Sequence, residues 1–307
     1  MEEDYEIKTC KLTKVYKKKA VVKGIDMHIK KGAIYGLIGQ NGAGKTTVLK
    51  MLAGLVKPTE GEIEVFGHQH LKKKVYRRMG SMIHLPTFYT NLTAIENLNI
   101  HRKMIGITNK EYIAEALDKV GLEKQYWDAP IKKYSRGLKQ RLGIARAILH
   151  KPELIVLDEP INGLDPNGIQ LIQQLLVDLC SRKNITILLT SHTLNRLESI
   201  VTTIGVLHKG VLLEEIQYED LRRKSRKCLN IKVSNDTRAC YILENKIGIY
   251  SYQVVEKNKL IIYEGLDRAS EIVRMLIIHN IDVIEIYESS YRLEDYFLEI
   301  TGGNKDV

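Results

Sequence analysis

The sequence predicts an α/β fold, followed by a smaller α+β unit in the C-terminal part. Up to about residue 215, short apolar runs of strand length alternate with stretches of helical periodicity, which favours a mixed sheet core with helices packed around it. After a charged segment, the expected order becomes strand, helix, strand, strand, helix, strand, which is typical of a ferredoxin-like unit. We therefore expect domains at residues 1–215 and 228–307, joined by a basic linker over 216–227.

In the first domain, residues 33–39 (AIYGLIG) are apolar and bounded by glycines, which predicts a buried strand. Val48, Met51 and Leu52 follow at helical spacing, which predicts an amphipathic helix directly after it. The capping box Thr93-x-x-Glu96 predicts the start of another helix. The remaining expected elements are strands over 61–66, 155–159 and 185–190, and helices over 109–120 and about 169–179.

The C-terminal part has shorter elements. Its charged beginning includes five Lys and Arg residues within 222–227 and no aromatic residue, a pattern that indicates an exposed linker rather than a reader of single-stranded nucleic acid. We expect strands over 228–233, 250–255, 260–264 and 281–287, and helices over 237–246, 267–279 and 293–300.

Composition excludes several classes of protein. No apolar run is long enough to span a bilayer, and the acidic, polar first residues do not predict a signal peptide. The four cysteines are scattered, which argues against a disulfide framework and fits a reducing cytosol. The net charge of +10 is compatible with acidic partners such as nucleotides, nucleic acid or an anionic membrane, and equally with a solvated, lysine-rich surface.

Residues 39–46 (GQNGAGKT) match the phosphate-loop pattern G-x-x-x-x-G-K-[ST]. The glycines allow the backbone to turn its N–H groups toward phosphate oxygens, and the following helix adds its positive end. Lys45 is expected to reach the β- and γ-phosphates, and the Thr46 hydroxyl to bind Mg²⁺. The predicted ATP-binding residues of this loop are Gly39, Asn41, Gly42, Ala43, Gly44, Lys45, Thr46 and Thr47.

A second motif follows the apolar run 154–157, where Asp158 and Glu159 end a predicted buried strand. This places both carboxylates at the carboxyl edge of the sheet, where ligands of open α/β sheets bind. Asp158 is expected to hold Mg²⁺, and Glu159 to orient or deprotonate the attacking water.

Three further motifs complete a pattern: residues 134–141 (YSRGLKQR), 162–165 (NGLD) and 191–192 (SH). With the phosphate loop and Asp158-Glu159, the chain resembles the nucleotide-binding domain of ATP-binding cassette (ABC) transporters over about residues 5–215. The resemblance implies ATP and Mg²⁺ as cofactors. It also implies a homodimer in which each protomer's signature motif contacts the ATP bound to its partner.

The resemblance also implies roles for single residues. Tyr16 lies where the family stacks a ring on adenine. The signature is formed by Ser135, Arg136, Gly137 and Leu138, of which Arg136 and Leu138 depart from the common family pattern. Asp165 matches the loop that couples the two sites, and His192 matches a histidine that senses the γ-phosphate. His84 stands where the family has a glutamine that touches Mg²⁺, so it is either a metal contact or an ordinary loop histidine.

Residues 85–93 and 293–301 narrow the resemblance to bacterial export ATPases of the bacitracin and lantibiotic type. This implies an ATP-hydrolysing subunit on the cytoplasmic face of the membrane, working with a separate transmembrane permease. A soluble ABC ATPase that acts on nucleic acid or ribosomes is the alternative, although no nucleic-acid partner is expected. A third possible function is that of a non-catalytic regulatory module. The presence of all the expected catalytic residues argues against it, namely Lys45, Asp158, Glu159 and His192.

Overall fold

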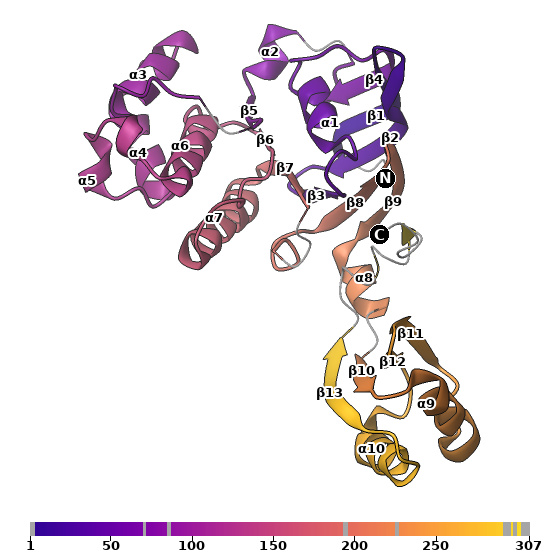
Figure 1. The fold of residues 1–307 in the computed structure, drawn as a ribbon. Helices are drawn as coiled ribbons and strands as arrows, with labels where there is room; N and C mark the ends of the chain where they lie inside the picture. Colours follow the sequence, from indigo (N-terminus) through magenta and orange to yellow (C-terminus); the bar gives the residue numbers. More distant parts are fainter. Residues whose placement is uncertain are drawn as a thin grey trace. The chain divides into compact units, whose positions relative to one another are not determined.

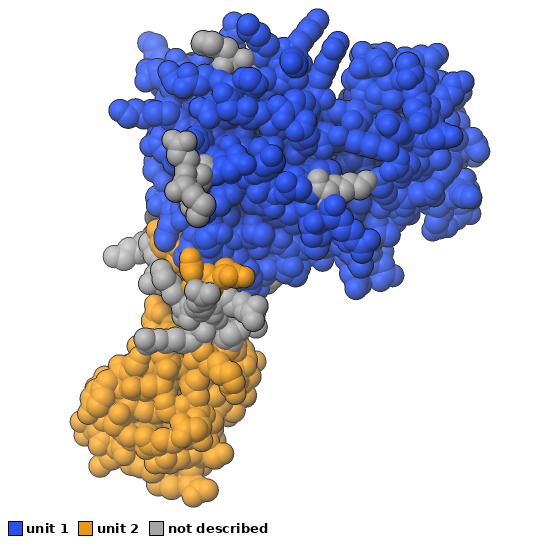
Figure 2. Space-filling model, turned by 180° about the vertical axis from the view of Figure 1, so that it is seen from behind, with its two compact units in different colours: residues 1–218 blue, residues 219–307 orange. Residues whose placement is uncertain are grey.

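The computed structural model describes residues 4–69, 72–84, 87–192, 196–224 and 227–290, together with Tyr296, Ile300 and Thr301. The chain forms two compact units, the first ending at Tyr218 and the second beginning at Glu219 (Figure 2). Within the described ranges, no helix is both long enough and apolar enough to cross a membrane.

A six-stranded mixed sheet forms the centre of the first unit (Figure 1). Four neighbouring strand pairs are parallel, and the last strand runs antiparallel to its neighbour. The residues of the central strands are buried, as their apolar runs predict. In sheet order the strands are β5 (Met79–Met82), β6 (Leu154–Leu157), β7 (Thr186–Ser191), β3 (Ile34–Ile38), β8 (Thr203–His208) and β9 (Val211–Gln217).

A second, antiparallel sheet contains β2 (Lys19–Lys30), β1 (Tyr5–Tyr16) and β4 (Glu60–Val65), in that order. Helix α1 (Lys45–Leu52) buries its apolar face in a core that both sheets share. The short helix α2 (Lys73–Tyr76) precedes β5. This core therefore fixes the loop before α1 against the carboxyl end of β3.

Helices that connect β5 to β6 form a group of their own (Figure 1). The predicted capping box at the first of them is present, because Thr93 Oγ1 accepts from Glu96 N at 3.1 Å and Glu96 Oε2 accepts from Thr93 N at 2.8 Å. The helices are α3 (Ala94–Met104), α4 (Glu111–Lys119), α5 (Lys124–Trp127), a 3₁₀ turn (Ile131–Lys133) and α6 (Arg136–Ile148). Helix α7 (Pro166–Lys183) follows β6.

The second unit has a four-stranded antiparallel sheet in the order β11-β12-β10-β13. This is the strand order of a ferredoxin-like fold, with its apolar core formed by the strands and two helical segments. The elements are β10 (Lys227–Val233), α9 (Asp236–Ile242) continued by a π-helical turn (Leu243–Ile247), β11 (Tyr252–Glu256), β12 (Lys259–Ile262), a 3₁₀ turn (Leu266–Arg268), α10 (Ala269–Ile278) and β13 (Val283–Ser290).

Two expectations for the C-terminal part concern the linker over 216–227 and the last helix over 293–300. The segment 216–227, expected as a linker, instead contains the end of β9 and the helix α8 (Tyr218–Lys224). The acidic residues Glu219 and Asp220 lie in its first turn. They favour a helix there, because negative side chains interact favourably with the positive N-terminal end of a helix. The helix expected over 293–300 lies almost wholly outside the described residues.

Candidate functional site

The phosphate loop connects the carboxyl end of β3 to the first turn of α1. Gly44 is the N-cap of α1 with a φ of 110°, and a Cβ there would lie 2.8 Å from the Val21 carbonyl oxygen. At Gly39 a Cβ would lie 2.2 Å from the Leu207 carbonyl oxygen. The loop therefore needs glycine at both positions. The first-turn N–H groups of α1 have no partner within the helix, so the loop forms a cradle that fits phosphate.

Lys45 lies at the centre of this cradle and is only 6% exposed. Its Nζ donates to the carbonyl oxygens of Gly39 at 2.5 Å and Gln40 at 3.2 Å, and lies 3.8 Å from Glu159 Oε1. Burial lowers the pKa of Lys45, and the carboxylates of Glu159 and Asp158 oppose that shift. The loop thus holds a buried cation beside the place where phosphate charge is expected.

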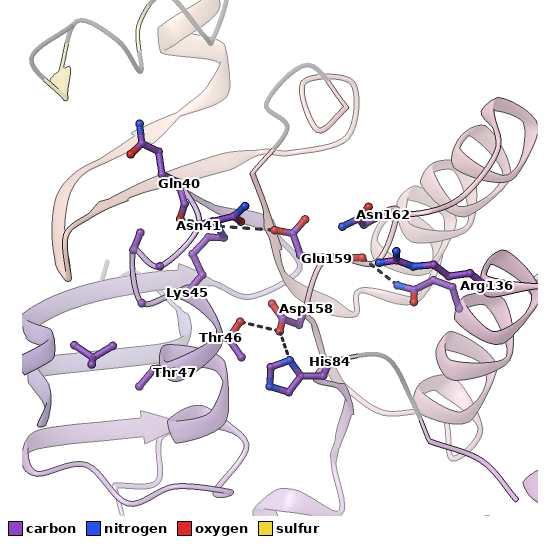
Figure 3. Close-up of a pocket in the computed structure, with 15 residues that line it drawn as sticks. Gln40, Asn41, Lys45, Thr46, Thr47, His84, Arg136, Asp158, Glu159 and Asn162 are labelled. Carbon is purple, nitrogen blue, oxygen red and sulfur yellow. Dashed lines mark hydrogen bonds and ion pairs between the residues drawn. The ribbon is translucent and has the colours of Figure 1, made fainter. Parts of the chain in front are cut away.

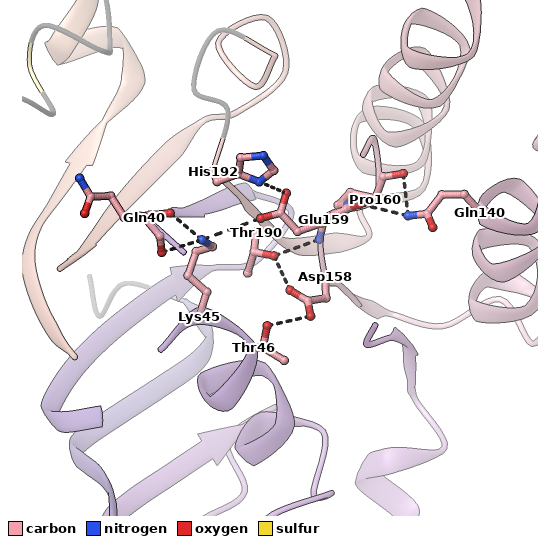
Figure 4. A network of polar contacts seen from close by, with 10 residues as sticks. Gln40, Lys45, Thr46, Gln140, Asp158, Glu159, Pro160, Thr190 and His192 are labelled. Carbon is pink, nitrogen blue, oxygen red and sulfur yellow. Dashed lines mark hydrogen bonds and ion pairs between the residues drawn. The ribbon is translucent and has the colours of Figure 1, made fainter. Parts of the chain in front are cut away.

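The carboxylate of Asp158, which directly follows β6, accepts hydrogen bonds from two hydroxyl groups (Figure 4). Thr46 Oγ1 donates to Oδ2 at 2.9 Å, and Thr190 Oγ1 donates to Oδ1 at 2.7 Å. His84 Nδ1 lies 3.8 Å from the same Oδ2. A carboxylate beside a threonine hydroxyl supplies the hard oxygen ligands that Mg²⁺ prefers, so these residues fit that metal.

Glu159 has a left-handed backbone with a φ of 50°. Its N–H donates to Thr190 Oγ1 at 3.0 Å, and its carbonyl oxygen accepts from Gln140 Nε2 at 3.0 Å. Oε2 of its side chain lies 2.9 Å from His192 Nδ1. The backbone and the carboxylate are therefore both held by neighbouring elements. A carboxylate held in this way is suited to accept a proton from a water molecule.

These groups line one cavity of about 380 Å³ (Figure 3). Of the predicted site residues, Asn41, Gly42, Ala43, Gly44, Lys45, Thr46, Thr47, His84, Arg136, Asp158 and Glu159 line it. The sequence reasoning missed Val21, Gln40, Gln140 and Asn162. Three of these stand inside the motifs on which the prediction rests, so the motifs could have given them, whereas Val21 lies outside every motif.

The other predicted site residues lie outside the cavity lining: Tyr16, Gly39, Ser135, Gly137, Leu138, Asp165 and His192. Gly39 and His192 nevertheless contact lining residues, as described above. Ser135 is the N-cap of α6, where its Oγ accepts from Leu138 N at 3.2 Å. Tyr16 is the last residue of β1, and its half-exposed ring lies 5.1 Å from Lys14 Nζ. Asp165 Oδ1 lies 3.6 Å from Arg141 Nη2.

Comparison with known proteins decides the family. The sequence model of the ABC transporter family matches residues 22–162. The bacitracin transport ATP-binding protein BcrA of Bacillus licheniformis is 44% identical over 97% of both chains. The chain belongs to the ABC transporter ATP-binding proteins. The lantibiotic transport ATP-binding protein SrtF of Streptococcus pyogenes is 39% identical over 69% of this chain and 91% of its own length.

Solved structures agree with this assignment of the ABC protein. An ATP-binding cassette in a dimeric post-hydrolysis state, bound to ADP and phosphate, matches 69% of this chain and 98% of its own length, with a TM-score of 0.65 and 27% identity. The resemblance seen in the sequence is thus confirmed. This ABC protein is an ATP-binding, ATP-hydrolysing subunit of a transporter. The relatives support that reading and not the alternative of an ATPase acting on nucleic acid or ribosomes.

Proposed function

We propose that this ABC ATPase powers the export of an antimicrobial peptide of the bacitracin or lantibiotic class. The observation that carries the proposal is its 44% identity to the bacitracin transport protein over 97% of both chains, since that match includes both units. In this proposal the chain is peripheral on the cytoplasmic face of the membrane. It acts on a separate transmembrane permease, which would carry the contacts to the exported compound.

At the ATP site, we assign the phosphates to Lys45 and the N–H groups of the loop, and Mg²⁺ to Thr46 and Asp158. Mg²⁺ held by these two residues would offset the negative charge of the phosphates. Glu159 takes a proton from the attacking water, and His192 holds the Glu159 carboxylate through their 2.9 Å contact. His84 also lines this site, and its Nδ1 lies 3.8 Å from Oδ2 of Asp158. Tyr16 is assigned to adenine.

We also propose that two copies assemble when ATP is bound, with Ser135, Gly137 and Asp165 of one protomer acting at the site of the other. The dimeric state of the solved ABC cassette supports this arrangement. Ser135 already caps the first turn of α6, so the hydroxyl and the helix N–H groups lie together at one end of that helix. Such an end attracts an anion.

The test is a resistance assay. The chain is expressed, together with a transmembrane permease subunit from the same genome, in a bacterium sensitive to bacitracin and to a lantibiotic, and the inhibitory concentration of each peptide is measured. We expect it to rise severalfold with the native chain and not with Glu159→Gln, whereas Glu62→Gln, an exposed change on β4, keeps the effect. A chain that purifies with ribosomes instead of membranes, and gives no resistance to either peptide class, would contradict the proposal.

A further inference from the structure

Arg136 is the first residue of α6, directly after the N-cap Ser135. Although it belongs to the signature, its side chain lines the same cavity as Lys45, Thr46 and Glu159 of its own chain. Figure 3 shows it extending from α6 toward Glu159. The signature resemblance implies contacts to the partner's nucleotide only, so this placement adds a group to the chain's own ATP pocket.

Gly163 leaves the space through which Arg136 reaches the cavity. A Cβ at Gly163 would lie 2.9 Å from Arg136 Nε, closer than real Cβ contacts, and 3.0 Å from its Cδ, a tight contact. Gly163 also has a φ of 81°, which disfavours any side chain. In this arrangement the Arg136 side chain passes directly over Gly163, where the absence of a Cβ leaves room for it.

The Arg136 guanidinium has no counter-ion in the described part of the chain, where it makes no hydrogen bond or ion pair. The cavity carboxylates are engaged by other groups. Asp158 accepts from Thr46 and Thr190, and Glu159 contacts His192 and Lys45. A free guanidinium that faces a phosphate cradle is matched to a phosphate, because its donors form paired hydrogen bonds with phosphate oxygens.

We propose that Arg136 binds the terminal phosphate of the ATP held by its own chain, and so favours ATP over ADP before any dimer forms. The proposal rests on the ATP site described above. The phosphate loop holds the nucleotide from the α1 side, whereas Arg136 approaches from α6. A group on α6 that reaches the last phosphate distinguishes ATP, which has a third phosphate, from ADP, which ends one phosphate earlier.

The experiment measures nucleotide affinity of the full chain at a concentration where light scattering finds monomers. A non-hydrolysable ATP analogue takes the place of ATP, so that every protein keeps Glu159 and the dimer-stabilising effect expected of Glu159→Gln is avoided. We expect Arg136→Gln to weaken binding of this analogue about tenfold or more, the loss of one charge-assisted contact, while ADP affinity changes less than twofold. Lys139→Gln removes a charge one turn further along α6, outside the cavity lining, and should change neither affinity.

Two results separate the possible failures. If Arg136→Gln leaves monomer affinity for ATP unchanged and weakens only the ATP-dependent dimer, Arg136 acts on the partner's nucleotide and the proposal is wrong. If Lys45→Ala binds ATP as tightly as the native chain, the phosphate site itself is misplaced and the failure lies there. Arg136→Lys should restore part of the ATP affinity, since it keeps the charge but not the paired donors.

Discussion

Glu159 shows how single residues are held for chemistry. A left-handed backbone at a residue other than glycine costs on the order of 1 kcal/mol or more, yet Glu159 keeps a φ of 50°. The Thr190 hydroxyl and the Gln140 amide bind its backbone, and His192 binds its carboxylate. Residues from β7, from α6 and from the position directly after β7 therefore stabilise this one strained position. In this conformation, Oε1 of the Glu159 carboxylate lies 3.8 Å from Lys45 Nζ in the phosphate loop.

Changing Glu159 to Gln should block hydrolysis and keep ATP binding, since the amide preserves the shape of the side chain but cannot accept the proton. We expect the rate of phosphate release to fall about 100-fold or more. ATP should then hold a dimer that persists in gel filtration. A Glu159→Gln protein that hydrolyses ATP at the native rate would mean that another residue handles the water. Glu62→Gln serves as the matched control.

Changing Lys45 to Ala should abolish tight nucleotide binding, because its buried ammonium group supplies the positive charge inside the phosphate loop, where it donates to the carbonyl oxygens of Gly39 and Gln40. We expect the Kd for ATP to rise at least tenfold, as for the loss of a charge-assisted contact. The measurement is calorimetric titration of the folded protein. Lys50→Ala, in the last turn of the same helix, controls for the loss of a lysine from α1. Unchanged affinity in Lys45→Ala would refute the assignment of the loop.

At the scale of elements, the sequence predicts a strand most reliably where all of its residues are buried. Strands β3, β6 and β7 are buried throughout and read as apolar runs. The longer β1 and β2 were not among the expected elements, because one face is exposed and lysine-rich and because β-bulges break their pairing register. A bulge shifts the inward and outward positions, so simple alternation does not identify such strands.

The contact between α3 and α6 makes a prediction about acid stability. Burial lowers the pKa of His101 on α3 to about 4, and the nearby charges of Arg146 on α6 and of His150, two residues after the end of α6, add to this shift. The unfolded chain binds this proton at its ordinary pKa, so the free energy of unfolding falls as pH drops from about 6.5 toward 4. Allowing for the partial exposure of the ring, we expect His101 to account for about 1 kcal/mol of lost stability between pH 7.5 and 5.

This is measured by urea unfolding, with the fluorescence of Trp127 as the signal. Trp127 is the single tryptophan and lies in α5, in the same group of helices. His101→Gln should lose less stability on acidification than the native chain. His150, whose pKa burial also lowers, leaves a smaller acid dependence in that variant. The exposed His68→Gln should behave like the native chain, and equal losses in all three proteins would exclude this role of His101.

At the scale of the whole molecule, the sequence predicts two units because its element order changes after a charged segment. The structure divides the chain between Tyr218 and Glu219, within the basic segment that the sequence marks as the boundary. The helical state of 218–224 could not be predicted from charge density, because a run of cations also suits a solvated loop. The antiparallel order of the second sheet, in contrast, follows from its sequence of elements.

This division predicts where a protease cuts first. Helix α8 has seven residues and ends in Arg222, Arg223 and Lys224, and the last turn of a short helix opens readily. Trypsin under native conditions should therefore cleave after these residues before it cleaves either unit. Each unit has its own apolar core, so the N-terminal fragment should keep its ATP affinity within about twofold. Early cleavage inside residues 30–200, or loss of ATP binding after the first cut, would mean that the first unit does not fold alone.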